Sequence, residues 1–130
     1  MRDNAWQTRL VAVLSDEKYK TYQRGETDCA MLVADCCVAL CGKDPAAEYR
    51  GKYSDLKGAL SALKEYGTIT DALDRHFERV DPAFAQRGDA VMMSDEMAVG
   101  IMWAGRVWTA EERKGICATG AEITVAWRVE

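Results

Sequence analysis

Histidine is nearly absent from this sequence, and three other features are missing. His76 is the only histidine among 130 residues, so catalysis through an imidazole base has a single candidate. The 17 Lys and Arg residues do not outnumber the 21 Asp and Glu residues, which argues against a nucleic-acid-binding groove. No apolar run approaches the roughly 18 residues of a membrane-spanning helix, and the N-terminus lacks a signal-peptide pattern. We therefore expect no membrane span, and synthesis in a cytoplasm without secretion by a signal of its own.

Length and composition predict a single soluble domain over residues 1–130, with 48% hydrophobic and 29% charged residues. The five cysteines are more than usual. Cys36, Cys37 and Cys41 are close in sequence but form no paired Cys-x-x-Cys zinc motif. Two interpretations stay open for them: small buried apolar side chains in a reducing compartment, or a metal site completed by another chain. We expect no cofactor and no metal site within this chain alone.

The first part of the chain is predicted to be helical. Apolar residues at helical spacing indicate helices over 4–15, 29–40, 55–66 and 68–77. The expected N-terminal signals are Asp28 and Ser54 as caps and Thr68 with Asp71 as a capping box. The second helix is apolar nearly all round and ends at Gly42, so it should be buried.

Beyond Pro82 the apolar residues alternate as in strands. We expect strands over 90–93, 98–103, 106–110, 115–118 and 122–129, with a hairpin turn at Ala104-Gly105. The predicted fold is α+β, with N-terminal helices followed by an antiparallel meander. Its parts are an N-terminal helix and lead-in (1–21), a helical part (22–79) and an antiparallel sheet (80–130).

Cys29 is the most informative residue because it opens the buried second helix directly after Asp28. A thiol at a helix start lies near unpaired N–H groups and the positive end of the helix dipole. Both favour the thiolate, which is the nucleophilic form. The alternative is a small core residue at a packed helix start. Asp28 is better explained as a cap than as a catalytic acid.

The order of several short motifs resembles the papain-like NlpC-type peptidoglycan peptidases. The matching residues are Tyr22, Gly25, Asp28-Cys29, Gly88-Asp89, Ala98-Val99-Gly100-Ile101-Met102, Gly105 and Trp108-Thr109-Ala110. The resemblance covers residues 22–129 and implies a papain-like fold. It makes Cys29 the candidate nucleophile, Tyr22 a residue that lines the site and helps hold the oxyanion, and Thr109 the third polar residue. It also puts Ala98 where that family has its catalytic histidine.

The missing histidine leaves the candidate nucleophile without a base. Alanine cannot accept a proton, and losing a positioned base typically costs about 100- to 10,000-fold in rate. His76 lies in a predicted helix outside the motif, where a solvated side chain is expected. The carboxylates near the strand ends are Asp95, Glu96, Glu111 and Glu112. A carboxylate raises a thiol pKa instead of lowering it, so these are poor substitutes.

The chain is also similar to small proteins encoded by tailed phages and prophages. The shared segments are Gly42-Lys43-Asp44, Arg50-Gly51-Lys52-Tyr53, Gly88-Asp89 and Ala126-Trp127-Arg128-Val129. This resemblance implies a tail-tip or baseplate component that resides in the virion tail after assembly in the host cytoplasm. Its implied partners are other tail proteins and, in addition, a cell-wall peptide.

Three functions follow as expectations. The first is a structural or assembly component of the tail tip on a degenerate cysteine-peptidase fold, with an apolar outer face of the sheet as its interface. The residues expected to divide between core and outer face are Met92, Met93, Met97, Met102, Trp103 and Trp108. The alternative is an active cysteine hydrolase that cuts cell-wall peptides with Cys29 and an unidentified base. The third is a metal-bearing tail component that uses Cys36, Cys37 and Cys41.

Overall fold

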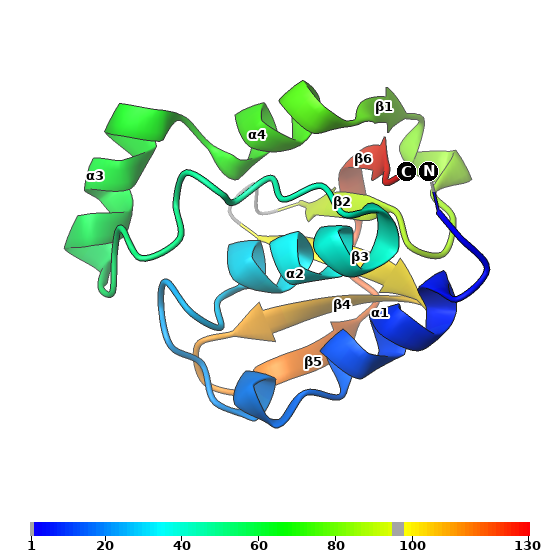
Figure 1. Ribbon diagram of the computed structural model, residues 1–130, viewed down its shortest axis with the longest axis horizontal. Coiled ribbons are helices and arrows are strands. Elements are labelled where there is room, and N and C mark those ends of the chain that lie inside the picture. Colours follow the sequence, from blue (N-terminus) through cyan, green and yellow to red (C-terminus); the bar gives the residue numbers. More distant parts are fainter. Residues whose placement is uncertain (1, 95–97) are drawn as a thin grey trace.

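The computed structural model describes residues 2–94 and 98–130. Its elements are α1 (Trp6–Leu14), η1 (Glu17–Lys20), α2 (Cys29–Cys41), α3 (Leu56–Tyr66), α4 (Ile69–His76), β1 (Glu78–Val80), η2 (Pro82–Phe84), β2 (Ala90–Met93), β3 (Val99–Trp103), β4 (Arg106–Glu111), β5 (Gly115–Thr119) and β6 (Ile123–Arg128). Helices precede an antiparallel sheet (Figure 1), which confirms the α+β prediction. None of the described helices is both long and apolar enough to span a bilayer.

The sheet has the strand order β1-β6-β2-β3-β4-β5. Strands β2 to β5 form the predicted meander, and the turn at Ala104 and Gly105 has the positive φ angles, 54° and 76°, of a tight hairpin. The prediction of a simple meander is wrong at its ends: β6 returns to pair with β2, and β1 adds an edge strand beside β6. Strand β1 was not predicted, because its three residues show no alternation of apolar and polar side chains. The sheet therefore begins at Glu78 and not at residue 80.

Helix α2 forms the centre of the molecule. It packs across β3 and β4, and α1 packs against it in turn, so two helices cover one face of the sheet (Figure 1). Leu32 and Val33 of α2 and Trp127 of β6 are fully buried in the main core. Cys36 and Cys37 are fully buried in the same cluster, as the interpretation as small apolar side chains requires.

The opposite face of the sheet is also largely buried. Val91, Met93, Val107 and Ala126 form a second cluster there, and each is at most 5% exposed. The expected apolar outer face of the sheet is therefore wrong for these residues, because side chains that include Val80 and Ala85 pack against them. Met92 is buried, whereas Met102, Trp103 and Trp108 are half-buried. Met97 lies outside the described residues.

Helix α3 differs from α2 in how little of it is covered. Ala62 is its only buried residue, and α3 lies at one end of the molecule, away from the sheet (Figure 1). Its N-cap is Asp55, whose Oδ1 accepts a hydrogen bond from the Gly58 N–H at 2.7 Å. The expected cap at Ser54 is wrong by one residue, since the Asp55 carboxylate provides the acceptor. The capping box of Thr68 and Asp71 at α4 is confirmed.

Candidate site around Cys29

The start of α2 is held by the Asp28 carboxylate. Its Oδ1 accepts from the Met31 N–H at 2.9 Å, which confirms the predicted cap. Its Oδ2 accepts from the Gly25 N–H at 2.8 Å and from the Tyr53 hydroxyl at 2.7 Å. Asp28 is only 5% exposed. The Asp28 carboxylate therefore connects the loop before α2 and the loop before α3 to the start of α2 through hydrogen bonds.

Gly25 is required by this arrangement. Its φ is +89°, which favours glycine, and a Cβ there would collide with the Tyr53 carbonyl. The two motifs that precede α2 and α3 along the sequence thus meet in space. Tyr53, which ends the Arg50–Tyr53 segment, is a site residue that the sequence analysis did not select.

The Cys29 thiol has a raised pKa, opposite to the predicted direction. Burial raises the pKa most, and the neighbouring Asp28 raises it further. The backbone N–H groups of Val99, Ala30 and Cys29 lower it, but by less than burial raises it. The expectation of an activated thiolate is wrong because the helix-terminal N–H groups do not offset the loss of water around the sulfur.

The structure brings Tyr22 and Cys29 together but not Thr109. Tyr22 and Cys29 line one pocket, whereas the Thr109 hydroxyl donates to the Val99 carbonyl at 2.8 Å within the sheet. Thr109 is 2% exposed, so its hydroxyl is committed to joining β4 to β3. Burial raises the pKa of Tyr22, and the Arg24 guanidinium lies 5.7 Å from the centre of its ring.

No histidine among the described residues lies beside Cys29 to act as its base. Ala98 directly precedes β3, and its side chain packs with the second sheet cluster, on the face away from α2. His76 is exposed at the end of α4, where its Nδ1 lies 2.9 Å from the Ala72 carbonyl. This placement confirms the predicted solvated helix histidine.

The candidate carboxylates are engaged elsewhere or lie outside the described residues. Glu112 pairs with Arg24 at 3.8 Å, and Glu111 pairs with Lys114 at 3.6 Å. Asp95 and Glu96 belong to the segment that the structure does not describe.

A pocket of about 150 Å³ opens beside Cys29, between the start of α2 and helices α3 and α4. Its lining residues are Tyr22, Arg24, Asp28, Cys29, Ala30, Tyr49, Tyr53, Ala59, Ala62, Leu63 and Ile69. Most of these side chains are apolar or aromatic. The sequence analysis missed the contribution of α3 and α4, because which helix closes a pocket depends on packing between distant segments.

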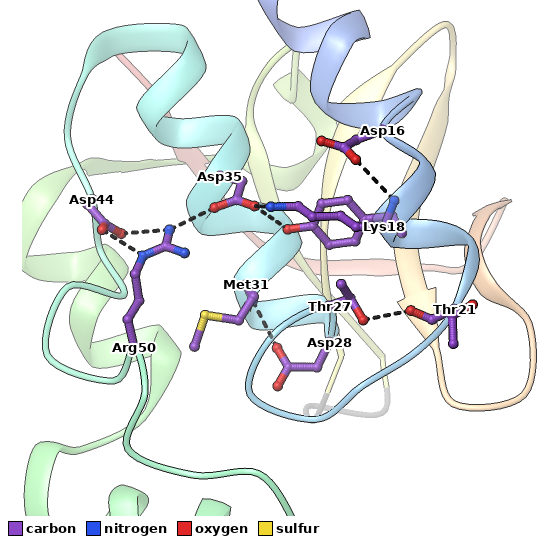
Figure 2. A network of polar contacts seen from close by, with 10 residues as sticks. Asp16, Lys18, Thr21, Thr27, Asp28, Met31, Asp35, Asp44 and Arg50 are labelled. Atoms are coloured by element: carbon purple, nitrogen blue, oxygen red, sulfur yellow. Dashed lines mark hydrogen bonds and ion pairs between the residues drawn. The ribbon is translucent and has the colours of Figure 1, made fainter.

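A polar network holds the segment that carries Tyr53. Asp35 of α2 accepts from the Tyr19 hydroxyl and pairs with Lys18 at 3.1 Å and with Arg50 at 2.8 Å. Arg50 also pairs with Asp44 at 2.8 Å (Figure 2). These contacts fix the chain between α2 and α3, so that Tyr53 reaches Asp28 three residues later.

The remaining cysteines form no recognisable ligand set. The Cys41 thiol donates to the Cys37 carbonyl at 3.4 Å. Across residues 2–94 and 98–130, no three His, Cys, Asp or Glu side chains are grouped so that they could hold a metal ion. The metal hypothesis for Cys36, Cys37 and Cys41 therefore gains no support from the described part of the chain.

Fold and site together define a class: a small α+β domain with a half-buried cysteine at the start of its central helix and an apolar pocket beside it. A family model described as a domain of unknown function, DUF6950, matches residues 1–129, and the chain belongs to this family. A comparison with curated proteins gives no match.

Proposed function

We propose that this protein is a structural component of a tailed-phage tail tip or baseplate, built on a degenerate papain-like, NlpC-type domain. The observation that supports the loss of catalysis is the half-buried Cys29 thiol, whose pKa is raised and which meets no described histidine. Its position at the start of a helix packed on β3 and β4 supports the papain-like relationship. The phage-like motifs in the sequence support the tail location.

A specific observation keeps the active hydrolase as the second candidate. The backbone N–H groups of Val99, Ala30 and Cys29 lower the pKa of the Cys29 thiol, and such donors also stabilise a developing oxyanion in acyl transfer. For this candidate to act, a partner chain or another unidentified group supplies the base. The cell-wall peptide remains its proposed substrate.

Thiol chemistry separates the two candidates. The alkylation rate of Cys29, taken as the difference between wild type and Cys29→Ala, is expected to rise only above the ordinary thiol pKa of about 8.5. Purified cell wall incubated with the protein is expected to release no peptide. A midpoint well below neutral pH, with peptide release that Cys29→Ala abolishes, would establish the hydrolase instead.

Assembly is tested in the phage or prophage that carries the gene. Deleting the gene should remove complete tails, as seen by electron microscopy, and Cys29→Ala should restore them together with infectivity. Complete, infective tails after deletion would refute the assembly role. If the wild-type gene restores tails but Cys29→Ala does not, the Cys29 thiol is itself required for tail assembly.

A further inference from the structure

Helix α3 carries a stripe of leucines that the described chain leaves about half exposed. Leu56, Leu60 and Leu63 follow helical spacing on one face and are 57%, 49% and 37% exposed. We call these three residues the α3 stripe. Scattered exposed leucines are ordinary, but a contiguous apolar row marks a surface that binds a partner.

The α3 stripe runs into the pocket beside Cys29. Leu63 belongs to both, and Ala59 and Ala62 of the same helix form part of the pocket wall. The pocket volume is about 150 Å³, and apolar cavities of that size hold a benzene-sized group. The α3 stripe can therefore contact the apolar side chains of a partner, and the pocket at its end is large enough for an aromatic ring.

Charge distinguishes the two edges of the α3 stripe. Lys57 and Lys64 each follow a stripe leucine by one residue, so they border one edge, about 100° around the helix. Both are exposed, and neither forms an ion pair with any residue that the structure describes. Glu65 lies on the far side of the helix from the stripe, by the same helical geometry. The other edge of the stripe adjoins the pocket wall.

We propose that the α3 stripe and the pocket form a docking site for an amphipathic helix of another protein. An aromatic side chain of that helix enters the pocket, its apolar face covers the stripe, and its acidic residues face Lys57 and Lys64. The inference rests on the proposed function, because the partner would then be another component of the tail. It gives the pocket a binding role that needs no chemistry at Cys29.

Charge decides against a second copy of this chain as the occupant. A two-fold contact between copies brings the same patch together on both sides. The partner edge would then offer lysines, not carboxylates, to Lys57 and Lys64. An acidic helix supplies the complement that a second copy lacks.

The test uses two synthetic amphipathic helices as probes. Each carries one Phe anchor on a leucine face, and the flanking residues are Glu in one peptide and Lys in the other. By fluorescence anisotropy, the Glu peptide should bind the full protein at least about tenfold more tightly than the Lys peptide. The double variant Lys57→Glu with Lys64→Glu should reverse that preference. Saturating Glu peptide should also slow the alkylation of Cys29, because the anchor fills the pocket that the thiol lines.

A matched pair of variants localises the contact. Leu60→Asp should abolish binding of the Glu peptide, while Val38→Asp should leave it unchanged. Val38 is the proper control because it is a comparably exposed aliphatic residue, 43% against 49%, on α2. Both variants replace exposed side chains, so both should fold.

Several results would overturn the docking site. These are no binding of the Glu peptide, equal binding of the two peptides, or equal loss in Leu60→Asp and Val38→Asp. A dimer in sedimentation that Leu60→Asp converts to a monomer would assign the stripe to a second copy. Stripe-dependent binding to vesicles of anionic lipid, without peptide binding, would assign it to a membrane surface.

The phage experiment keeps this inference separate from the proposed function. If gene deletion abolishes tails but Leu60→Asp restores them fully, the docking site is wrong and the assembly role stands. If the peptides bind as expected but deletion leaves tails intact, the docking site stands and the tail role is wrong. A photo-crosslinking residue at position 60 in assembled tails should capture a segment with an aromatic residue flanked by acids.

Discussion

Helices α2 and α3 carry the same local signals, but the chain buries one and leaves much of the other exposed. Each has an aspartate cap at its start and a glycine at its end, and they are 13 and 11 residues long. Helix α2 has seven buried residues, whereas α3 has one. The difference lies in sequence and in position: α2 is apolar nearly all round and packs on the sheet and against α1, whereas α3 has one apolar face and lies at the end of the molecule (Figure 1).

An apolar pattern predicts that a helix face is stabilised when it is covered, but it does not say which segment covers that face. Apolar residues at helical spacing indicate a face that is stabilised by being covered. In α2 the rest of the chain provides that cover. In α3 the apolar residues Leu56, Leu60 and Leu63 form one regular row, which the described chain leaves 37% to 57% exposed. The all-round apolar pattern of α2 therefore indicates a core, whereas the one-sided pattern of α3 is where we propose the docking surface.

The largest difference should appear when one leucine is truncated in each helix. Leu32→Ala in α2 removes a fully buried side chain and should lower the free energy of unfolding by about 3–5 kcal/mol. Leu60→Ala in α3 removes a side chain that is 49% exposed and should change it by less than about 0.5 kcal/mol. Urea unfolding followed by circular dichroism measures both. Equal losses would mean that α3 is buried in solution, and the docking surface would not exist.

The two aspartate caps should differ next. Asp28→Ala removes a helix cap and also leaves the Gly25 N–H and the Tyr53 hydroxyl without their acceptor. A cap is worth about 1 kcal/mol and each of the two unsatisfied groups costs about 1 kcal/mol or more, so the loss should reach at least about 3 kcal/mol. Asp55→Ala removes only a cap in an exposed position and should cost about 1 kcal/mol.

Asparagine at the same positions provides the control for the caps. Asp28→Asn keeps an oxygen for the Met31 N–H, so it should lose less than Asp28→Ala. If Asp28→Ala and Asp55→Ala cost the same in urea unfolding, the contacts of Asp28 with Gly25 and Tyr53 contribute nothing measurable. The link between the two loops would then be an incidental contact.

Local signals explain why much of the fold follows from the sequence. The helices that begin at a cap residue and end at a glycine have observed ends within a residue or two of the predicted ends. The same holds for the two strands on either side of the Ala104-Gly105 turn. Strand β1 did not, because its pairing with β6 joins residues about 50 positions apart and leaves no local pattern. Ser54 and Asp55 are both capable caps, and only the geometry of the helix start selects between them.

The site was less predictable than the fold. The placement of Cys29 at the helix start was correct, but its pKa depends on how far the folded chain removes it from water, which no local pattern reveals. Asp89 shows the same limit. The aspartate fixes its turn as expected, by accepting from the Gln86 N–H at 2.8 Å. It is also fully buried and paired with Arg2 and Arg128, from the two ends of the chain.

The smallest effect concerns pH and tests whether charge adds to the burial of α2. Burial raises the pKa of Asp35, but hydrogen bonds from Tyr19, Lys18 and Arg50 outweigh it and leave the pKa lowered. A carboxylate with a lowered pKa stabilises the fold above the unfolded value of about 3.9. That contribution is lost as the pH falls through the folded value.

Asp35→Asn should therefore reduce stability near neutral pH by less than about 1 kcal/mol, because Lys18 and Arg50 are solvent-exposed partners. The difference from wild type should shrink as the pH falls below about 4, where Asp35 of the unfolded chain becomes protonated, and it should vanish at the lower pH where folded Asp35 is protonated as well. Urea unfolding at pH 3, 5 and 7 measures this difference, with Leu60→Ala as a control whose effect should not vary with pH. A constant difference across that range would show that Asp35 acts on α2 as a packed polar group and that its charge adds nothing.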